Sequence, residues 1–214
     1  MMSLLEFFYR NRAEIWTLTL EHCWLVGMSM LLAVVIGVPL GILITRRASL
    51  NKPILGGANI IQTIPSLALF GFLLPMPWLG ARADRLAIAA LTGYALLPVI
   101  RNTYTGIMGV DPSVREAARG MGLTDWQLLW HVELPLALGV ILAGIRVATV
   151  ITVGVATIAA AIGAGGLGEF IFRGLAMVDN RVILAGAIPA ALMALLADFL
   201  LGWAGRHLVP SAKS

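Results

Sequence analysis

Charged residues and cysteine are both scarce in this chain. Only 12% of its 214 residues are charged and 59% are apolar, a composition far from that of a soluble globular domain. The single cysteine, Cys23, excludes an intrachain disulfide, and the three histidines are too dispersed to predict a metal site. There is no G-x-x-x-x-G-K-[ST] phosphate loop, so we expect neither ATP hydrolysis nor a cofactor in this chain.

The basic residues do not indicate nucleic-acid binding, although the net charge is +4. The 15 lysines and arginines are spread over loops and chain ends and form no patch with interleaved aromatic residues. The sequence shows no nucleophile paired with a base either, so no catalytic residue is predicted. Composition therefore favours an integral membrane protein that is not itself an enzyme.

Five apolar stretches are long enough to cross a membrane. They lie near 22–44, 54–75, 86–108, 136–162 and 182–204, and about 20 residues of helix cross the roughly 30 Å hydrocarbon core. Runs such as 31–36 and 153–162 are apolar at every position, whereas strands of a membrane barrel alternate. We therefore predict an all-α polytopic membrane protein with about five transmembrane helices.

The first connecting loop predicts the orientation. Arg46, Arg47 and Lys52 stand there without an acidic neighbour, as is typical of a cytoplasmic loop. Five spans then place an N-terminal segment, 1–21, outside the cell and a tail, 206–214, in the cytoplasm, with a membrane domain at 22–205 between them. The N-terminus lacks the pattern of a cleaved signal peptide, so the first span should be retained.

Glycine and proline are frequent within the predicted spans. Gly37 and Gly41 form a G-xxx-G pair, which either lets two helices approach closely or reflects the general abundance of glycine in membrane helices. Prolines predict kinks in the first, second, third and fifth spans: Pro39, Pro65, Pro98 and Pro189.

Residues 111–135 form a polar, helix-prone insert between apolar stretches. Asp111 and Pro112 are typical of a helix start, and Gly122 of a helix stop. Thr124 and Gln127 have the spacing of a capping box, which predicts a second helix that Pro135 closes as it opens the next span. The insert is either a docking surface for a soluble partner or an interfacial hairpin resting on the membrane.

The same insert resembles the EAA loop of binding-protein-dependent ABC importer permeases, the type I importer core. The resemblance rests on a spaced set of residues, with Val132 in place of the more usual isoleucine: Glu116, Ala117, Ala118, Gly122, Leu134 and Pro135. Stretches such as IPSLALFGFLLP and IGAGGLGEFIFRGLA resemble the branch that imports glycine betaine, choline or carnitine. Compact permeases for amino acids such as methionine share the loop and the size, so that substrate class is the alternative.

The resemblance implies a multi-pass subunit of a bacterial cell (inner) membrane, working with several partners. These are a second permease, either a copy or a paralogue, ABC ATPase subunits that use ATP and Mg, and an extracytoplasmic substrate-binding protein. Glu116, Ala117, Ala118 and Gly122 would seat in the ATPase, while Leu134 and Pro135 would join this lever to the fourth span. An ion-gradient-driven carrier or channel and a membrane scaffold are the alternatives from other classes.

A glycine-rich turn follows the fourth span. Gly163, Gly165 and Gly168 match G-x-G-x-x-G, but they follow a helix and not a strand, which excludes a dinucleotide site. The turn is either a flexible extracytoplasmic connection or an outer gate that contacts the binding protein. The candidate contact residues are Gly165, Gly166, Glu169 and Arg173.

Two charges lie inside apolar segments. Arg146 and Asp198 are placed where a lone charge is costly, so we predict that they form a structural or gating pair, in preference to contacting substrate. Tyr94 and Tyr104 line the transport pathway, pack in the core or anchor the chain at the membrane interface.

Overall fold

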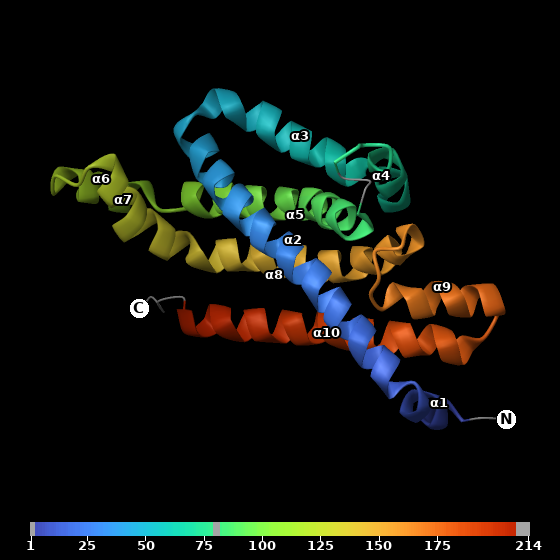
Figure 1. The fold of residues 1–214 in the computed structure, drawn as a ribbon. Coiled ribbons are helices and arrows are strands. Elements are labelled where there is room, and N and C mark those ends of the chain that lie inside the picture. The colour runs from blue at the N-terminus through green and yellow to red at the C-terminus, as the bar shows by residue number, and fades with distance from the viewer. Residues whose placement is uncertain (1–2, 79–81, 209–214) are drawn as a thin grey trace.

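The computed structural model describes residues 3–78 and 82–208, and within them the chain is almost entirely helical (Figure 1). The predicted all-α class is therefore confirmed. Lys213 and the rest of 209–214, which belong to the predicted tail, lie outside the described residues, as do Met1 and Met2. The helices are α1 (Leu4–Arg10), α2 (Arg12–Arg46), η1 (Ala48–Leu50), α3 (Asn51–Thr63), α4 (Ser66–Leu73), α5 (Ala83–Met108), α6 (Pro112–Gly120), α7 (Asp125–Leu128), η2 (Leu129–Glu133), α8 (Leu134–Ala159), η3 (Ala160–Ile162), α9 (Gly168–Met177) and α10 (Asn180–Leu208).

Four uninterrupted helical stretches in the described part of the chain are long and apolar enough to span a membrane: 12–46, 83–108, 125–162 and 180–207. The predicted span at 54–75 is instead split between α3 and α4, which meet at an angle of 101°. The expectation of about five spans holds when this bent pair is counted as one. The chain is a multi-pass membrane protein.

Pro65 accounts for the break in the second span. A residue before proline is pushed from helical to extended backbone, and Ile64 has φ −70° and ψ 129°. The carbonyl of Ile64, which is left outside the helix, accepts a hydrogen bond from the Tyr94 hydroxyl on α5. Prolines 39, 98 and 189 lie inside continuous helices, so of the four prolines predicted to kink the spans, Pro65 is the one at which a helix ends.

The first membrane-spanning helix, α2, is longer than predicted. It begins at Arg12, whereas the apolar stretch in the sequence begins at about residue 22. The additional turns carry Glu14 and Glu21, two carboxylates that contact residues after α8. Their polarity hid this part of the helix from a hydropathy-based prediction.

Helix α5 forms the centre of the bundle, between α2 and α8, and α10 packs on α8 and α9. Fourteen residues of α5 are buried, as expected for a helix that is covered on both sides. A Cβ atom added to Gly37 would lie 2.8 Å from Val99 Cγ1, and one added to Gly41 would lie 2.5 Å from Thr103 Cβ. The G-xxx-G pair therefore sets the close approach of α2 to α5.

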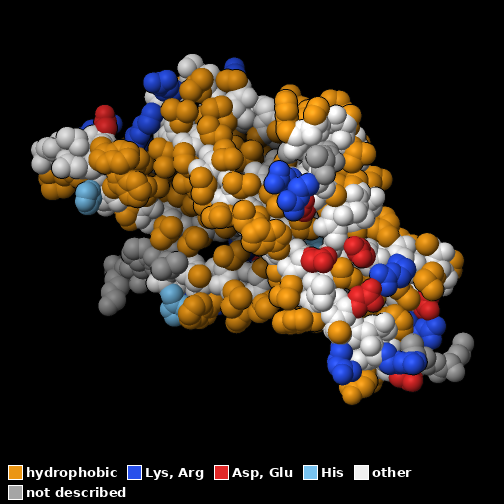
Figure 2. Space-filling view, in the orientation of Figure 1, with side chains coloured by type: hydrophobic (Ala, Val, Ile, Leu, Met, Phe, Trp, Pro, Cys, Tyr) orange, Lys and Arg blue, Asp and Glu red, His pale blue; other side chains and the backbone are white. Residues whose placement is uncertain are grey.

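The two ends of the bundle differ in content. One end holds α6, α7, the last turn of α2 and the C-terminal end of α10, and the other holds α1, α4 and α9 (Figure 1). Figure 2 shows apolar side chains over most of the middle of the molecule, and charged side chains gathered mainly toward its ends. This distribution fits a bilayer around the middle of the bundle.

Candidate functional site

The predicted start of the insert is present in the structure. The Asp111 side chain accepts a hydrogen bond of 2.8 Å from the Ser113 N–H, and Pro112 occupies the first turn of α6. Hydrogen bonds from the Ser113 side chain and from its backbone N–H lower the pKa of the Asp111 carboxyl. The N-terminus of α6 is thus held by a local cap, as the sequence indicated.

Helix α6 ends in a Schellman motif. Gly122 has φ +87°, a left-handed conformation that favours glycine. Its N–H donates to Arg119 O at 2.9 Å, and the Leu123 N–H donates to Ala118 O at 3.2 Å, the bond pair that defines this motif. The predicted role of Gly122 as the stop of the first insert helix is confirmed.

Pro135 opens the next span, α8, as predicted, but it does not close the second insert helix. The capping box at Thr124 and Gln127 is present and begins α7, but the chain then continues through a π-helical turn, η2, directly into α8. Pro135 lies in the first turn of α8. Proline removes a helical N–H and crowds the preceding turn, and a wider π turn just before it accommodates the ring without a break.

The motif residues of the insert divide into exposed and buried sets. Glu116, Ala117 and Gly122 are exposed, whereas Ala118 is 2% exposed. The expectation that all four seat in a partner is therefore corrected for Ala118, which packs within this chain and supports α6 from inside. Leu134 and Pro135 are partly buried where η2 meets α8.

Two exposed tryptophans lie beside the polar face of the insert. Trp126 is 67% and Trp130 is 52% exposed, and their rings meet edge to face with centroids 5.5 Å apart. They line an apolar groove of about 1080 Å³ with Val38, Ile42 and Leu43 of α2. Exposed tryptophans are typical of the membrane–water interface. For the insert, contact with the membrane therefore suits α7, and docking of a soluble partner suits α6.

A buried carboxylate in the insert was missed by the sequence analysis. Glu133 is 1% exposed and forms ion pairs with Arg46 at the end of α2 and Arg115 of α6. Its position in the apolar run LLWHVELP was the available signal, because a carboxylate in such a run requires a cationic partner. The partner at residue 46 is too distant in sequence to be identified from spacing.

The glycine turn at the other end of the bundle is held against α2. Gly163, Gly165 and Gly166 have φ of +78°, +83° and +82°. The Gly166 N–H donates to Glu21 Oε2 at 3.0 Å, and a Cβ atom on Gly165 would lie 2.5 Å from the same oxygen. Both glycines are buried, so the expectation that they contact a binding protein is corrected: they fix the turn on α2.

Glu169 and Arg173, the other two candidate contacts, are available at the surface. Their side chains are 40% and 43% exposed. Arg173 donates to Glu14 at 2.8 Å, and this hydrogen bond raises the pKa of the guanidinium. The ion pair joins α9 to the N-terminal part of α2 that the hydropathy prediction omitted.

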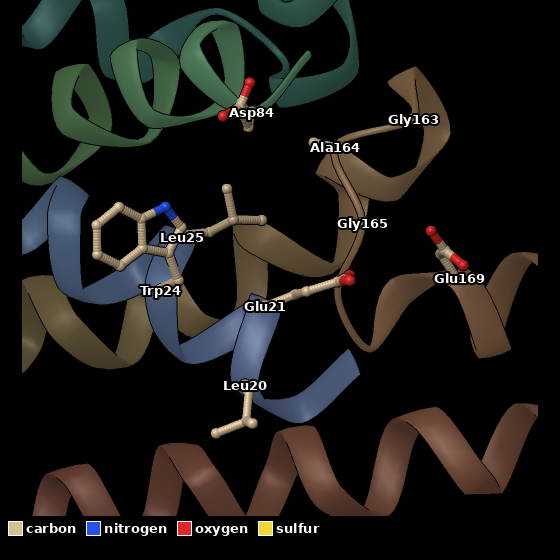
Figure 3. A pocket seen from close by; sticks show the side chains of 9 residues that line it. All are labelled: Leu20, Glu21, Trp24, Leu25, Asp84, Gly163, Ala164, Gly165 and Glu169. Carbon is tan, nitrogen blue, oxygen red and sulfur yellow. The ribbon is translucent and has the colours of Figure 1, made fainter. Parts of the chain in front are cut away.

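A cavity of about 510 Å³ opens beside this turn (Figure 3). Glu21 and Trp24 come from α2, Asp84 from the start of α5, and Glu169 from the start of α9. Figure 3 shows the Glu21 carboxylate directed toward Gly165. Three carboxylates and an indole thus surround an opening at the end of the bundle remote from the insert.

Arg146 of α8 and Asp198 of α10 are in contact. Arg146 Nε and Nη2 both donate to the Asp198 carboxylate, the latter at 2.5 Å from Oδ2. The side chains are 44% and 38% exposed. The structure thus brings together the two charges that the sequence placed in apolar segments, and their role in gating stays a prediction.

Removing one member of this pair should cost more stability than removing both. We expect Asp198→Leu to lower the midpoint of thermal unfolding in detergent further than Arg146→Leu/Asp198→Leu does, because the single change leaves an unpaired cation in an apolar segment. A double-mutant cycle on the purified chain measures the interaction. Strictly additive effects of the single changes would contradict the pairing.

The two tyrosines pack within the bundle. Tyr94 is 5% exposed and donates to the Ile64 carbonyl at the α3–α4 bend. Tyr104 is partly buried against the cluster of Ile44, Leu97 and Ile100. Of the alternatives for these residues, the structure supports core packing.

A multi-pass helical bundle with a polar insert between α5 and α8 is the fold of a type I ABC importer permease core, which solved structures of this class share. The family model described as binding-protein-dependent transport system inner membrane component matches residues 37–214. The chain belongs to this family, whose members are transport subunits.

Relatives and solved structures agree with this assignment. The chain is 45% identical over 202 residues to the osmoprotectant import permease protein OsmW of Salmonella typhimurium, covering 94% of each chain. It is 42% identical over 212 residues to the carnitine transport permease protein OpuCB of Listeria monocytogenes, covering 99% of this chain and 96% of the relative. Its fold matches a chain of the inward-facing MetNI methionine ABC transporter with a TM-score of 0.80 at 24% identity, over 92% of this chain and 94% of that one.

Proposed function

We propose that this chain is the permease subunit of a bacterial ABC importer that carries glycine betaine or a related quaternary ammonium osmoprotectant into the cell. The observation that carries the proposal is near-full-length similarity to permeases named for such solutes. Besides the two relatives above, the choline transport system permease protein OpuBB of Bacillus subtilis is 41% identical over 211 residues. The likeness to the methionine transporter supports the fold alone, so the osmoprotectant branch is favoured over the amino-acid branch.

The energy for transport comes from partner subunits. The chain contains no phosphate loop, and its family name supports an importer that receives substrate from a binding protein. We infer a complex of two permeases, a second copy or a paralogue, with two ATPase subunits that use ATP and Mg. In this complex the chain itself carries no cofactor.

The exposed face of α6 is the proposed docking surface for the ATPase. It lies at the same end of the bundle as Arg46, Arg47 and Lys52 (Figure 1), and basic loops favour the cytoplasmic side. Glu116 and Ala117 face outward there, with a carboxylate to accept hydrogen bonds and a small side chain that permits close approach. The α1 and α9 end would then face outward, where Glu169 and Arg173 would meet the binding protein.

Docking at α6 explains how hydrolysis in another subunit can move this one. ATP can shift the permease between inward-open and outward-open states only if the ATPase binds those states with different free energies. Helix α6 is set apart from the bundle by Gly109 and the Gly122 turn, so it can serve as the lever through which that difference acts.

The outer cavity suits the proposed substrate class. A quaternary ammonium group carries a diffuse positive charge that is attracted by an indole face and by carboxylates. Trp24, Glu21, Asp84 and Glu169 provide both around the opening. These groups would favour entry of a cationic or zwitterionic solute released by the binding protein.

Uptake measurements test the proposal. We expect radiolabelled glycine betaine to accumulate in proteoliposomes that contain this chain with its ATPase and binding protein, only when ATP is present, and unlabelled methionine not to compete. Accumulation of methionine instead would move the chain to the amino-acid branch. Uptake by this chain alone along an ion gradient would contradict the importer.

A further inference from the structure

The insert is joined to the membrane helices through one buried carboxylate. The side chain of Glu133 is 2% exposed. Arg46 Nη2 pairs with its Oε2, Arg46 Nη1 lies 3.4 Å from Oε1, and Arg115 Nε lies 3.3 Å from Oε1. A single negative charge is therefore placed between two guanidinium groups.

The three residues come from three separate elements. Arg46 is the last residue of α2, Arg115 belongs to α6, and Glu133 ends the π turn η2 that leads into α8. Arg115 Nη2 also donates to the Ile107 carbonyl near the end of α5. One network thus connects α6 with the ends of three membrane helices, α2, α5 and α8.

This network is the main polar attachment of α6 to the bundle among the described residues. Within α6 itself only Ala118 is buried, and its small side chain offers little apolar contact. Apart from Ala118 and the partly buried Arg115, the residues of α6 are exposed, as a docking surface requires. Displacement of α6 by a partner must therefore act on the membrane helices largely through Arg115 and Glu133 and through the chain connections.

The chemistry of the network requires all three members. A buried carboxylate is tolerated when paired, and its removal leaves uncompensated cations facing one another. Without Glu133, Arg46 and Arg115 would repel each other and α6 would separate from the end of α2. The adjacent π turn adds a second feature, since π turns inside helices recur at functional sites.

We propose that Glu133 is a positioning residue for energy coupling, which holds α6 against α2 and α8 so that movement of α6 is transmitted to both. The inference rests on the proposed function, because it names the connection through which the ATPase acts. It concerns a side chain that a partner does not contact, buried behind the docking surface.

The test compares transport with hydrolysis in the assembled complex. We expect Glu133→Gln to assemble with the ATPase in wild-type amounts but to move about tenfold less glycine betaine per ATP hydrolysed, a loss within the usual range of coupling between sites. Glu133→Asp, which keeps the charge, should recover most of the ratio. Glu6→Gln, the same chemical change at an exposed carboxylate of α1, is the matched control and should match the wild type.

Each outcome is decisive. A wild-type ratio of transport to hydrolysis in Glu133→Gln overturns the inference and leaves the importer intact, as does less assembled complex with an unchanged ratio.

If Glu133→Gln fails to accumulate, Arg46→Gln is measured in the same way, because that side chain is 33% exposed and tolerates change better. A reduced ratio there supports the inference, and a normal one overturns it. A wild-type complex without ATP-driven uptake overturns the proposed function and the inference with it.

Discussion

Glu116→Lys is expected to abolish most ATP-driven uptake while the chain still inserts in the membrane. Glu116 is exposed on α6, so its replacement leaves the bundle intact. Lysine cannot accept the hydrogen bonds that a carboxylate accepts, and it reverses the charge of the proposed docking face, so any partner group that pairs with the carboxylate is lost. We expect uptake of glycine betaine in proteoliposomes to fall by about tenfold or more, in the range of site-to-site coupling energies.

Glu6→Lys serves as the control for this charge reversal. Glu6 is also an exposed carboxylate of a short helix, α1, but it lies at the opposite end of the bundle. The control should retain uptake close to the wild-type rate. Near-normal uptake in Glu116→Lys, with equal amounts of chain in the membrane, would show that α6 does not receive the ATPase.

Gly168→Ala is expected to destabilise the chain more than an added methyl group usually does. A Cβ atom at Gly168 would overlap the Thr157 carbonyl and lie 2.8 Å from the Ala160 Cβ. The start of α9 would have to move away from the end of α8, and overpacking of this kind costs about 1–3 kcal/mol of unfolding free energy. Denaturation of the purified chain in detergent, followed by circular dichroism, measures the loss.

Gly154→Ala is the matched control for the packing prediction. Gly154 lies on α8, and a Cβ atom there would meet nothing within 4 Å. Alanine should leave stability unchanged or raise it slightly, because it favours helix more than glycine does. Equal stability of Gly168→Ala and Gly154→Ala would contradict the close contact between α8 and α9.

Local signals in the insert were read correctly because they act over a few residues. Asp111 with Pro112, the left-handed Gly122, and the Thr124–Gln127 box each satisfy backbone groups within one turn. Such caps are determined mainly by neighbouring residues, so a sequence pattern of a few residues is enough to predict them. The family motif and the composition were equally accessible, which is why the fold class could be predicted.

The remaining features depend on contacts between distant residues. Glu133 is buried by Arg46, 87 residues away, and no spacing rule connects them. The motif marked Ala118 without indicating that it faces inward, and the glycine turn marked Gly165 and Gly166 without indicating that Glu21 covers them. Burial is decided by which helices meet, and a sequence pattern leaves that undetermined.

The second span shows a related limit of hydropathy. The stretch 54–75 is apolar enough for one helix, yet Pro65 and the extended Ile64 divide it. Proline inside α2, α5 and α10 produces no such division. At Pro65 the Tyr94 hydroxyl donates a hydrogen bond to the carbonyl of Ile64 that the break leaves free, and this contact comes from another helix.

Site-specific cross-linking tests most directly whether α6 receives the ATPase. Cys23 is the single cysteine, so Cys23→Ser allows one new cysteine to carry a benzophenone maleimide. We place it at Ala117 on α6 or, as a control, at Leu175 on α9, which is 57% exposed at the opposite end. In the assembled complex the label at 117 should join this chain to the ATPase and the label at 175 should not. An ATPase adduct from 175, with none from 117, would contradict the proposed route of energy into the membrane.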